Sequence, residues 1–99
     1  MESQANVFWT LKASKDFENI VSYLKTNWSE KEINNFIAKL NKAINLISSR
    51  PKLFIVTNSR KNLRRCVLTK QTTIYYKEAD SKIYIVSLHD NRQNSITTS

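Results

Sequence analysis

The sequence predicts one α+β domain, built from an N-terminal strand, an antiparallel two-helix hairpin and a three-stranded antiparallel meander. The chain has 99 residues, of which 40% are hydrophobic and 24% charged, a composition typical of a single globular domain. Apolar side chains recur at helical spacing in the first half, whereas the second half holds short segments rich in Ile, Val, Thr and Tyr. Helices that precede strands in this way are expected to cover one face of a small mixed sheet.

The first strand and the first helix follow one another closely. Residues 6–10 are aromatic and β-branched, which is typical of a strand. Ser14 is expected to cap a helix that runs to about Asn27. The apolar positions of this helix form one stripe, made of Phe17, Ile20, Val21, Leu24 and Trp28. We expect both tryptophans, Trp9 and Trp28, to lie in the core.

The second helix has clear signals at both ends. Ser29 and Glu32 have the spacing of a capping box, which marks its start. Pro51 disfavours helical backbone at the residue before it, so the helix should end near Ser49. Almost no loop separates the two helices, which predicts an antiparallel hairpin. One face of the second helix carries Ile33, Phe36, Ile37, Leu40, Ile44 and Ile47.

Three strands are predicted after the helices, at residues 63–69, 72–78 and 82–88. The two connections between them are short enough for hairpin turns, which makes the three strands a meander. Before them, an apolar run at 53–56 gives way to a polar loop at 57–61, and no strand is predicted there. The domain is expected to span residues 6–95, with 1–5 and 96–99 as flexible ends.

The charge is one-sided. Sixteen Lys and Arg stand against eight Asp and Glu, for a net charge of +8. No acidic residue occurs between Glu32 and Glu78, an interval that holds ten basic residues. This pattern predicts an anionic partner, which would be nucleic acid, a nucleoprotein surface or an acidic protein segment. A basic surface that only keeps the protein in solution is the alternative.

Composition excludes several classes of site. The absence of glycine excludes a P-loop, a dinucleotide-binding glycine turn and a glycine-rich kinase loop. One cysteine forms neither an internal disulfide nor a cysteine-based zinc site, and His89 is the only histidine. We therefore predict no metal and no cofactor. The longest apolar runs are far shorter than the roughly 20 residues of a membrane span, so no membrane association is expected. Because the single cysteine forms no internal disulfide, the reducing cytoplasm is the expected location.

Short motifs spread along the chain carry a family resemblance. They are Val7-x-Trp9-Thr10, the run from Ala13 to Leu24, Trp28-Ser29, Leu63-Arg64-Arg65-x-Val67, Ile74-x-Tyr76 and the ending from Ile83 to Asn94. In this order they resemble the RelE/ParE superfamily of toxins from bacterial type II toxin–antitoxin systems, over about residues 6–95. The resemblance implies the α+β fold expected above.

The superfamily divides by mechanism. The resemblance implies either a ribosome-dependent mRNA endonuclease, as in RelE-like members, or a protein that poisons DNA gyrase, as in ParE-like members. A nuclease would use Arg64, Arg65, His89 and Tyr76 for charge and proton transfer, and Tyr75 and Tyr84 are further candidates for these roles. RelE-like nucleases carry a Tyr or His close to the C-terminus. Residues 93–99 contain neither, which favours the ParE-like branch.

The favoured interpretation is a toxin that inhibits growth by binding an essential target, with DNA gyrase as that target. The expected target-binding residues are Lys61, Arg64, Arg65 and Arg92. Arg64 and Arg65 are adjacent in a strand and should point to opposite faces, one pairing with a carboxylate beside a helix and the other projecting to a partner. The ribosome and its mRNA are the alternative target, and a non-toxic nucleic-acid-binding module is the second alternative. The resemblance also implies a cognate antitoxin and a toxin–antitoxin heterotetramer.

Overall fold

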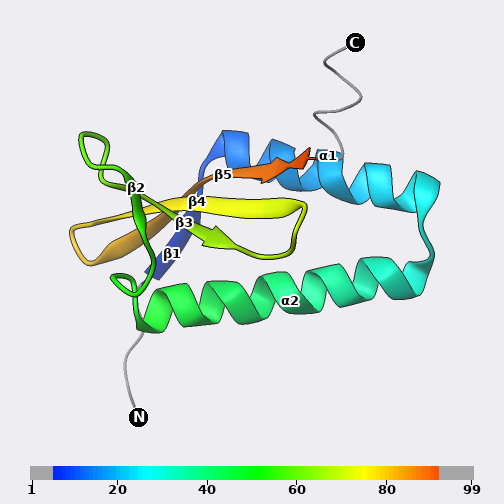
Figure 1. Ribbon diagram of the computed structural model, residues 1–99, viewed down its shortest axis with the longest axis horizontal. Coiled ribbons are helices and arrows are strands. Elements are labelled where there is room, and N and C mark those ends of the chain that lie inside the picture. Colours follow the sequence, from blue (N-terminus) through cyan, green and yellow to red (C-terminus); the bar gives the residue numbers. More distant parts are fainter. Residues whose placement is uncertain (1–5, 92–99) are drawn as a thin grey trace.

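The computed structural model describes residues 6–91 and has the predicted α+β architecture with one additional strand. In chain order the elements are β1 (Asn6–Trp9), α1 (Leu11–Asn27), α2 (Glu30–Ser49), β2 (Val56–Asn58), β3 (Leu63–Val67), β4 (Thr72–Ala79) and β5 (Lys82–Asp90). The two helices form a hairpin, and four strands follow them rather than three (Figure 1). The predicted strands end within one or two residues of the observed ends.

The strands form one five-stranded sheet with the order β1-β5-β4-β3-β2. β1 runs parallel to β5, whereas every other pair is antiparallel. The prediction of a polar loop at residues 57–61 is wrong at Thr57 and Asn58, which belong to β2. An edge strand needs only a neighbour for its backbone, and β3 supplies it by placing Arg64 opposite Val56.

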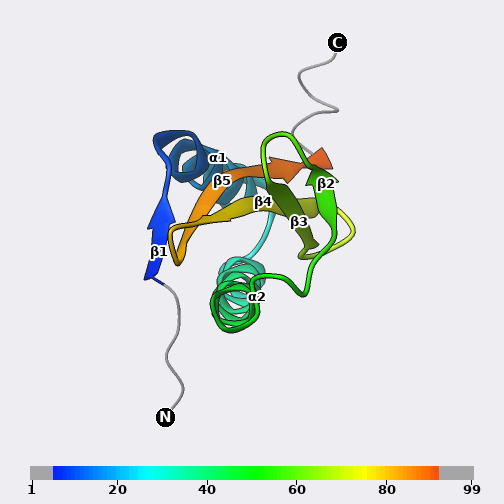
Figure 2. The ribbon, with the colours of Figure 1, turned by 90° about the vertical axis from the view of Figure 1, so that its left-hand side faces the viewer.

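The sheet curves around α2, and α1 lies beside β5 (Figure 2). One face of the sheet carries the buried side chains, and we call it the inner face; the opposite face is the outer face. The buried strand residues of the inner face are Cys66, Ile74, Tyr76, Ile83, Ile85 and Leu88. They pack with Ile20 and Leu24 of α1 and with Phe36, Leu40 and Ile47 of α2. The hydrophobic core therefore lies between the inner face and the helices.

The first helix begins earlier than predicted. Thr10, and not Ser14, is the N-cap, and its hydroxyl oxygen accepts a hydrogen bond of 3.1 Å from the Ala13 N–H. The same hydroxyl donates to the Val86 carbonyl oxygen at 2.9 Å. The N-cap is Thr10 and not Ser14 because the Thr10 hydroxyl both caps the helix and links the end of β1 to β5 by a hydrogen bond. The helix ends at Asn27, as predicted.

The second helix has the predicted ends. Its N-cap Ser29 accepts a hydrogen bond from the Glu32 N–H at 3.3 Å, and its last residue is Ser49. Among residues 6–91, no helix is both long and apolar enough to span a membrane.

The two tryptophans differ in burial. Trp9 is half-buried and packs edge-to-face on Phe17, with the ring centroids 5.9 Å apart. Trp28 is 44% exposed, so the prediction that it lies in the core is wrong. It caps the C-terminus of α1, in the turn between the helices.

Candidate functional site

The two adjacent arginines of β3 lie on opposite faces of the sheet, as predicted. Arg64 is opposite the buried Tyr76 on the inner face. Arg65 is opposite Tyr75 on the outer face and is exposed. The strict alternation of side chains along a strand produces this separation. The two arginine side chains therefore lie in different environments.

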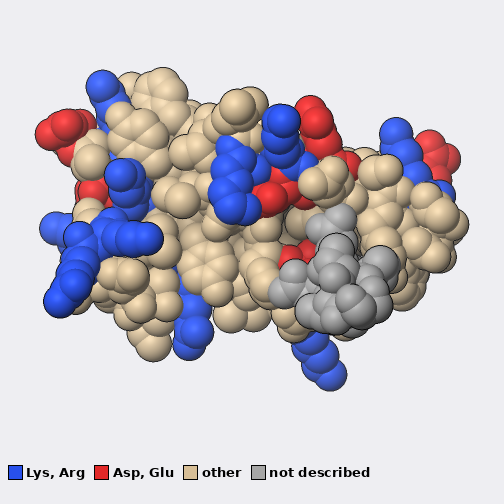
Figure 3. Space-filling view, turned by 90° about the horizontal axis from the view of Figure 1, so that it is seen from above, with Lys and Arg blue, Asp and Glu red and all other residues tan. Residues whose placement is uncertain are grey.

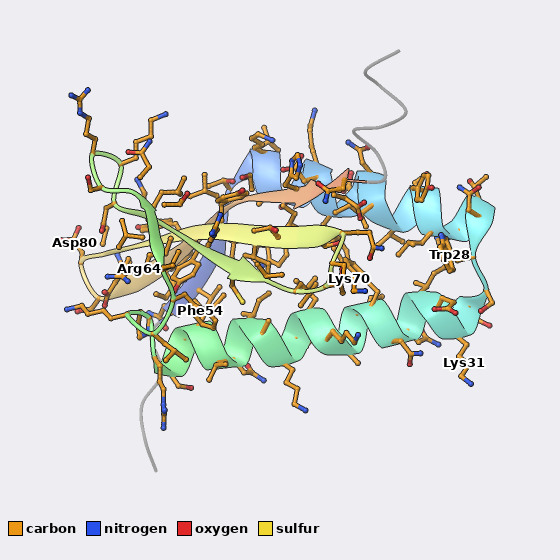
Figure 4. All side chains as sticks on the ribbon, viewed as in Figure 1. Trp28, Lys31, Phe54, Arg64, Lys70 and Asp80 are labelled. Carbon is orange, nitrogen blue, oxygen red and sulfur yellow. The ribbon has the colours of Figure 1, made fainter. Side chains whose placement is uncertain are left out.

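Arg64 is held by backbone oxygen atoms. Its Nη1 donates to the Phe54 carbonyl at 2.6 Å and to the Lys52 carbonyl at 3.4 Å. Its partners are therefore carbonyls of the 50–55 segment, which joins α2 to β2, and not the expected carboxylate. Figure 4 shows Arg64 and Phe54 together beside β2, at the end of the molecule opposite Trp28. Hydrogen bonds from a charged donor contribute about 1.5–3 kcal/mol each, so Arg64 fixes this segment.

Tyr76 anchors the same segment from the core. It is fully buried, and its hydroxyl donates to the Pro51 carbonyl at 2.7 Å. Phe54 packs edge-to-face on Tyr76, with the two ring centroids 6.2 Å apart. Burial raises the pKa of Tyr76 to about 12, although the nearby charge of Arg64 acts in the opposite direction. Tyr76 is thus a neutral side chain whose proton is already engaged.

The outer face brings together a second group of candidates. Arg65, Tyr75 and Ser87 face one another across β3, β4 and β5. His89 lies opposite Thr73, on the same face of the sheet and two residues beyond Ser87 in β5. Arg65, Tyr75 and His89 therefore share a surface. The four residues predicted for a nuclease are divided between the faces, with Arg64 and Tyr76 inside and Arg65 and His89 outside.

The other two predicted target-binding residues lie elsewhere. Lys61 is exposed in the turn between β2 and β3, where its N–H donates to Asn58 Oδ1 at 3.2 Å. Arg92 lies outside the described residues. Seen from above in Figure 3, Lys and Arg side chains gather at the left-hand end of the molecule. In Figure 1 the β2–β3 and β4–β5 turns lie at that end.

Sequence reasoning missed an aromatic row on the outer face. Phe8 of β1 stacks on Tyr84 of β5 with ring centroids 5.7 Å apart. Lys77 Nζ lies 6.0 Å from the Tyr84 centroid, and Lys82 Nζ lies 5.9 Å from that of Phe8. The row depends on the parallel register that places Phe8 opposite Tyr84. No local sequence pattern indicates that register, because 76 positions separate Phe8 from Tyr84.

Two cavities open on the helical hairpin. One, of about 240 Å³, lies between Trp28, Phe36 and the β3–β4 turn at Thr69. The other, of about 360 Å³, lies between the helices beside Phe17 and Leu40. Neither contains the arginines of β3 or His89. Within residues 6–91, no group of three or more His, Cys, Asp and Glu is placed to hold a metal ion.

Comparisons with known proteins agree with this architecture. Residues 7–94 match the family described as ParE toxin of type II toxin–antitoxin system, parDE. A search of curated protein sequences gave no significant match.

Several solved structures share the fold. A chain of the chromosomal ParDE toxin–antitoxin system from P. aeruginosa superposes with a TM-score of 0.74 at 11% identity, covering 88% of this chain and 96% of that one. A chain of the E. coli DinJ–YafQ toxin–antitoxin complex gives 0.63 at 14%, covering 92% and 97%. The Helicobacter pylori protein HP0894 gives 0.57 at 18%, covering 89% and 96%.

Proposed function

Because the chain belongs to the ParE toxin family of type II toxin–antitoxin systems, we propose that it inhibits growth by binding DNA gyrase. It acts as a binding protein and performs no chemistry of its own. A cognate antitoxin neutralises it.

The division of the nuclease candidates between the two faces carries this proposal. Cleavage of RNA needs positive charge, a base and an acid gathered around one phosphodiester. Arg64 and Tyr76 are on the inner face, where their polar groups bond the carbonyls of Phe54 and Pro51. The remaining nuclease candidates, Arg65, Tyr75, Tyr84 and His89, lie on the outer face. The exposed cation Arg65 is better suited to binding an anionic target surface.

A supercoiling assay with purified gyrase and relaxed plasmid tests the target. The protein is expected to inhibit supercoiling, and Arg65→Ala is expected to inhibit it less. Lys31→Ala is the matched control, because Lys31 is also an exposed cation and lies on α2, at the opposite end of the molecule from Arg64, the neighbour of Arg65 (Figure 4). Unchanged supercoiling with the wild-type protein would contradict the gyrase assignment.

The outer-face group favours one alternative function. Arg65, Tyr75 and His89 lie on three neighbouring strands and include a cation and two groups able to transfer protons. A ribosome-dependent mRNA endonuclease would use this group. Primer extension on an mRNA undergoing translation tests it. Cleavage that disappears in His89→Ala and in Tyr75→Phe would replace gyrase with the ribosome as the target.

The antitoxin is supported by likeness and by charge. Two of the structurally similar chains come from a ParDE system and from a DinJ–YafQ toxin–antitoxin complex. The net charge of +8 attracts an acidic chain, which can order as it binds. We expect two toxins and two antitoxins in the complex, and light scattering on the co-purified proteins would test that stoichiometry. Failure of an antitoxin to bind would favour the non-toxic nucleic-acid-binding module.

A further inference from the structure

The two helices leave the outer face of the sheet uncovered. Both helices pack against the buried strand residues of the inner face. Figure 2 shows α2 inside the curve of the sheet and α1 beside β5. Phe8, on the outer face, is 44% exposed. A single exposed hydrophobic residue needs no explanation, so the neighbours of Phe8 decide whether this face is an interaction surface.

Phe8 belongs to an aromatic pair that spans two strands. It stacks on Tyr84 with the ring centroids 5.7 Å apart, because the parallel pairing of β1 with β5 places the two residues opposite each other. In the next strand, Lys77 lies opposite Tyr84, and its Nζ is 6.0 Å from the centroid of the tyrosine ring. Lys82 Nζ lies 5.9 Å from the centroid of the Phe8 ring. The pair therefore has an ammonium group beside each ring.

The charged side chains at the outer positions of the strands have one sign. These positions carry Arg65, Lys77 and Lys82. The two acidic residues within the described strands, Glu78 and Asp90, alternate to the inner face. An aromatic pair surrounded by cations is complementary to an apolar site that is surrounded by anionic groups.

The geometry of the aromatic pair favours a protein surface over single-stranded nucleic acid. A base binds an aromatic side chain by stacking on a free ring face. Here the two rings stack on each other with an angle of 27° between their planes, and a lysine lies over each of them. Since the ring faces are engaged, a partner meets the ring edges. Such edges fit an apolar depression in a protein, like other aromatic side chains at the centre of an interface.

We propose that the outer face of the sheet is the surface through which this protein binds gyrase. The Phe8–Tyr84 pair enters an apolar depression of gyrase, and Arg65, Lys77 and Lys82 pair with carboxylates around that depression. The inference rests on the proposed function for the identity of the partner. It extends that function from Arg65 alone to an aromatic anchor on β1 and β5.

The affinity for purified gyrase, free of DNA, tests this surface. The full chain is immobilised, and biolayer interferometry gives the dissociation constant. Phe8→Ala removes half of the aromatic pair, and Lys82→Glu reverses an exposed cation beside it. Each variant is expected to weaken binding about tenfold. Added salt should weaken binding of the wild type more than binding of Lys82→Glu, because the variant has lost an attraction that salt screens.

Matched controls come from the helical hairpin. Trp28→Ala removes an aromatic side chain with the same 44% exposure as Phe8. Lys31→Glu reverses an exposed cation on α2. Trp28 and Lys31 lie together at the end of the molecule opposite Arg64 (Figure 4), and both controls are expected to bind like the wild type. Circular dichroism checks that each variant is folded, and Lys82→Glu alone decides the matter if Phe8→Ala is not.

The possible results separate this surface from the proposed function. Wild-type affinity in Lys82→Glu or in a folded Phe8→Ala, or equal losses in the controls, would overturn the surface and leave gyrase as the target. No binding by the wild-type protein would remove the proposed function and this inference with it. Binding that appears only when DNA is added would make nucleic acid the occupant. Loss of antitoxin binding with unchanged gyrase binding would assign the face to the antitoxin, and either result would overturn the proposal.

Discussion

The Asp16 carboxylate accepts a hydrogen bond of 3.1 Å from the backbone N–H of Leu88, which lies 72 positions later in the chain. β1 pairs with β5 only as far as Ile85. Beyond that point α1 takes the place of a strand along β5, and Asp16 supplies the acceptor that a strand would have offered. This contact joins the helical hairpin to the last strand of the sheet.

Asp16→Ala is expected to lower the free energy of unfolding by about 1–3 kcal/mol, because it leaves the N–H of Leu88 without its charged acceptor. Urea denaturation measures the change. Lys12→Ala is the control, since Lys12 Nζ lies 3.0 Å from Asp16 but is 68% exposed. That variant is expected to change stability by less than about 1 kcal/mol. Equal losses in the two variants would assign the effect to the ion pair instead.

Substitutions of Arg64 and Arg65 are expected to affect stability and toxicity differently. Arg64→Ala removes the donor to the Phe54 and Lys52 carbonyls and should lower stability by about 1–3 kcal/mol. Arg65→Ala alters an exposed side chain and should change stability by less than about 0.5 kcal/mol. Growth inhibition should nevertheless weaken in Arg65→Ala. Denaturation and a growth assay on the same variants check both parts, and a fully toxic Arg65→Ala would contradict the second.

Tyr76 gives the fold a sensitivity to alkali. Its pKa is raised from 10.0 to about 12, so the neutral form is favoured in the folded state. The resulting stabilisation is complete below pH 10 and is lost as the pH rises from 10 to 12, because the unfolded chain loses the proton first. The loss amounts to about 2–3 kcal/mol. Tyr76→Phe should lack this decline, and parallel stability curves for the two proteins above pH 10 would contradict the account.

The β4–β5 turn offers a stabilising substitution. Asp80 and Ser81 have φ angles of 54° and 63°, in the left-handed region, and the protein has no glycine to place there. Ser81→Gly is expected to raise stability by about 0.5–1 kcal/mol. Ala79→Gly, in the adjoining strand, is the control and should lower it. Thermal unfolding measures both, and a loss in Ser81→Gly would show that the serine has another role.

The single thiol reports on unfolding. Cys66 is 5% exposed on the inner face, and burial raises the pKa of its thiol. Both effects slow its reaction with a thiol reagent in the folded protein. When the reagent is concentrated enough to react before the chain refolds, the rate of modification should equal the unfolding rate, which stopped-flow measurement of unfolding supplies independently. Immediate modification of the folded protein would contradict the buried position.

Local patterns predicted the elements well where one segment decides the outcome. The stripe and capping box of α2 needed no partner, so its ends were predicted correctly. Alternation likewise put Arg64 and Arg65 on opposite faces. Features that depend on distant segments were not predictable. β2 forms because its backbone pairs with that of β3. Thr10, and not Ser14, is the N-cap because its hydroxyl also donates a hydrogen bond to β5.

The candidate site shows the same limit. The sequence could not tell which arginine faces inward, because that depends on the register that sets Arg64 opposite Tyr76. Nor could it reveal that carbonyls would be the partners of Arg64. Aromatic stacking between Phe8 and Tyr84 required a parallel pairing across the whole chain.

Pulse labelling in bacteria tests the central claim most directly. The protein is induced without antitoxin, and incorporation of labelled thymidine and methionine is followed from the moment of induction. The account predicts that DNA synthesis falls first and that protein synthesis falls later, in the wild type and in His89→Ala alike. An immediate fall in protein synthesis that His89→Ala prevents would contradict it and place an active site on the outer face of the sheet.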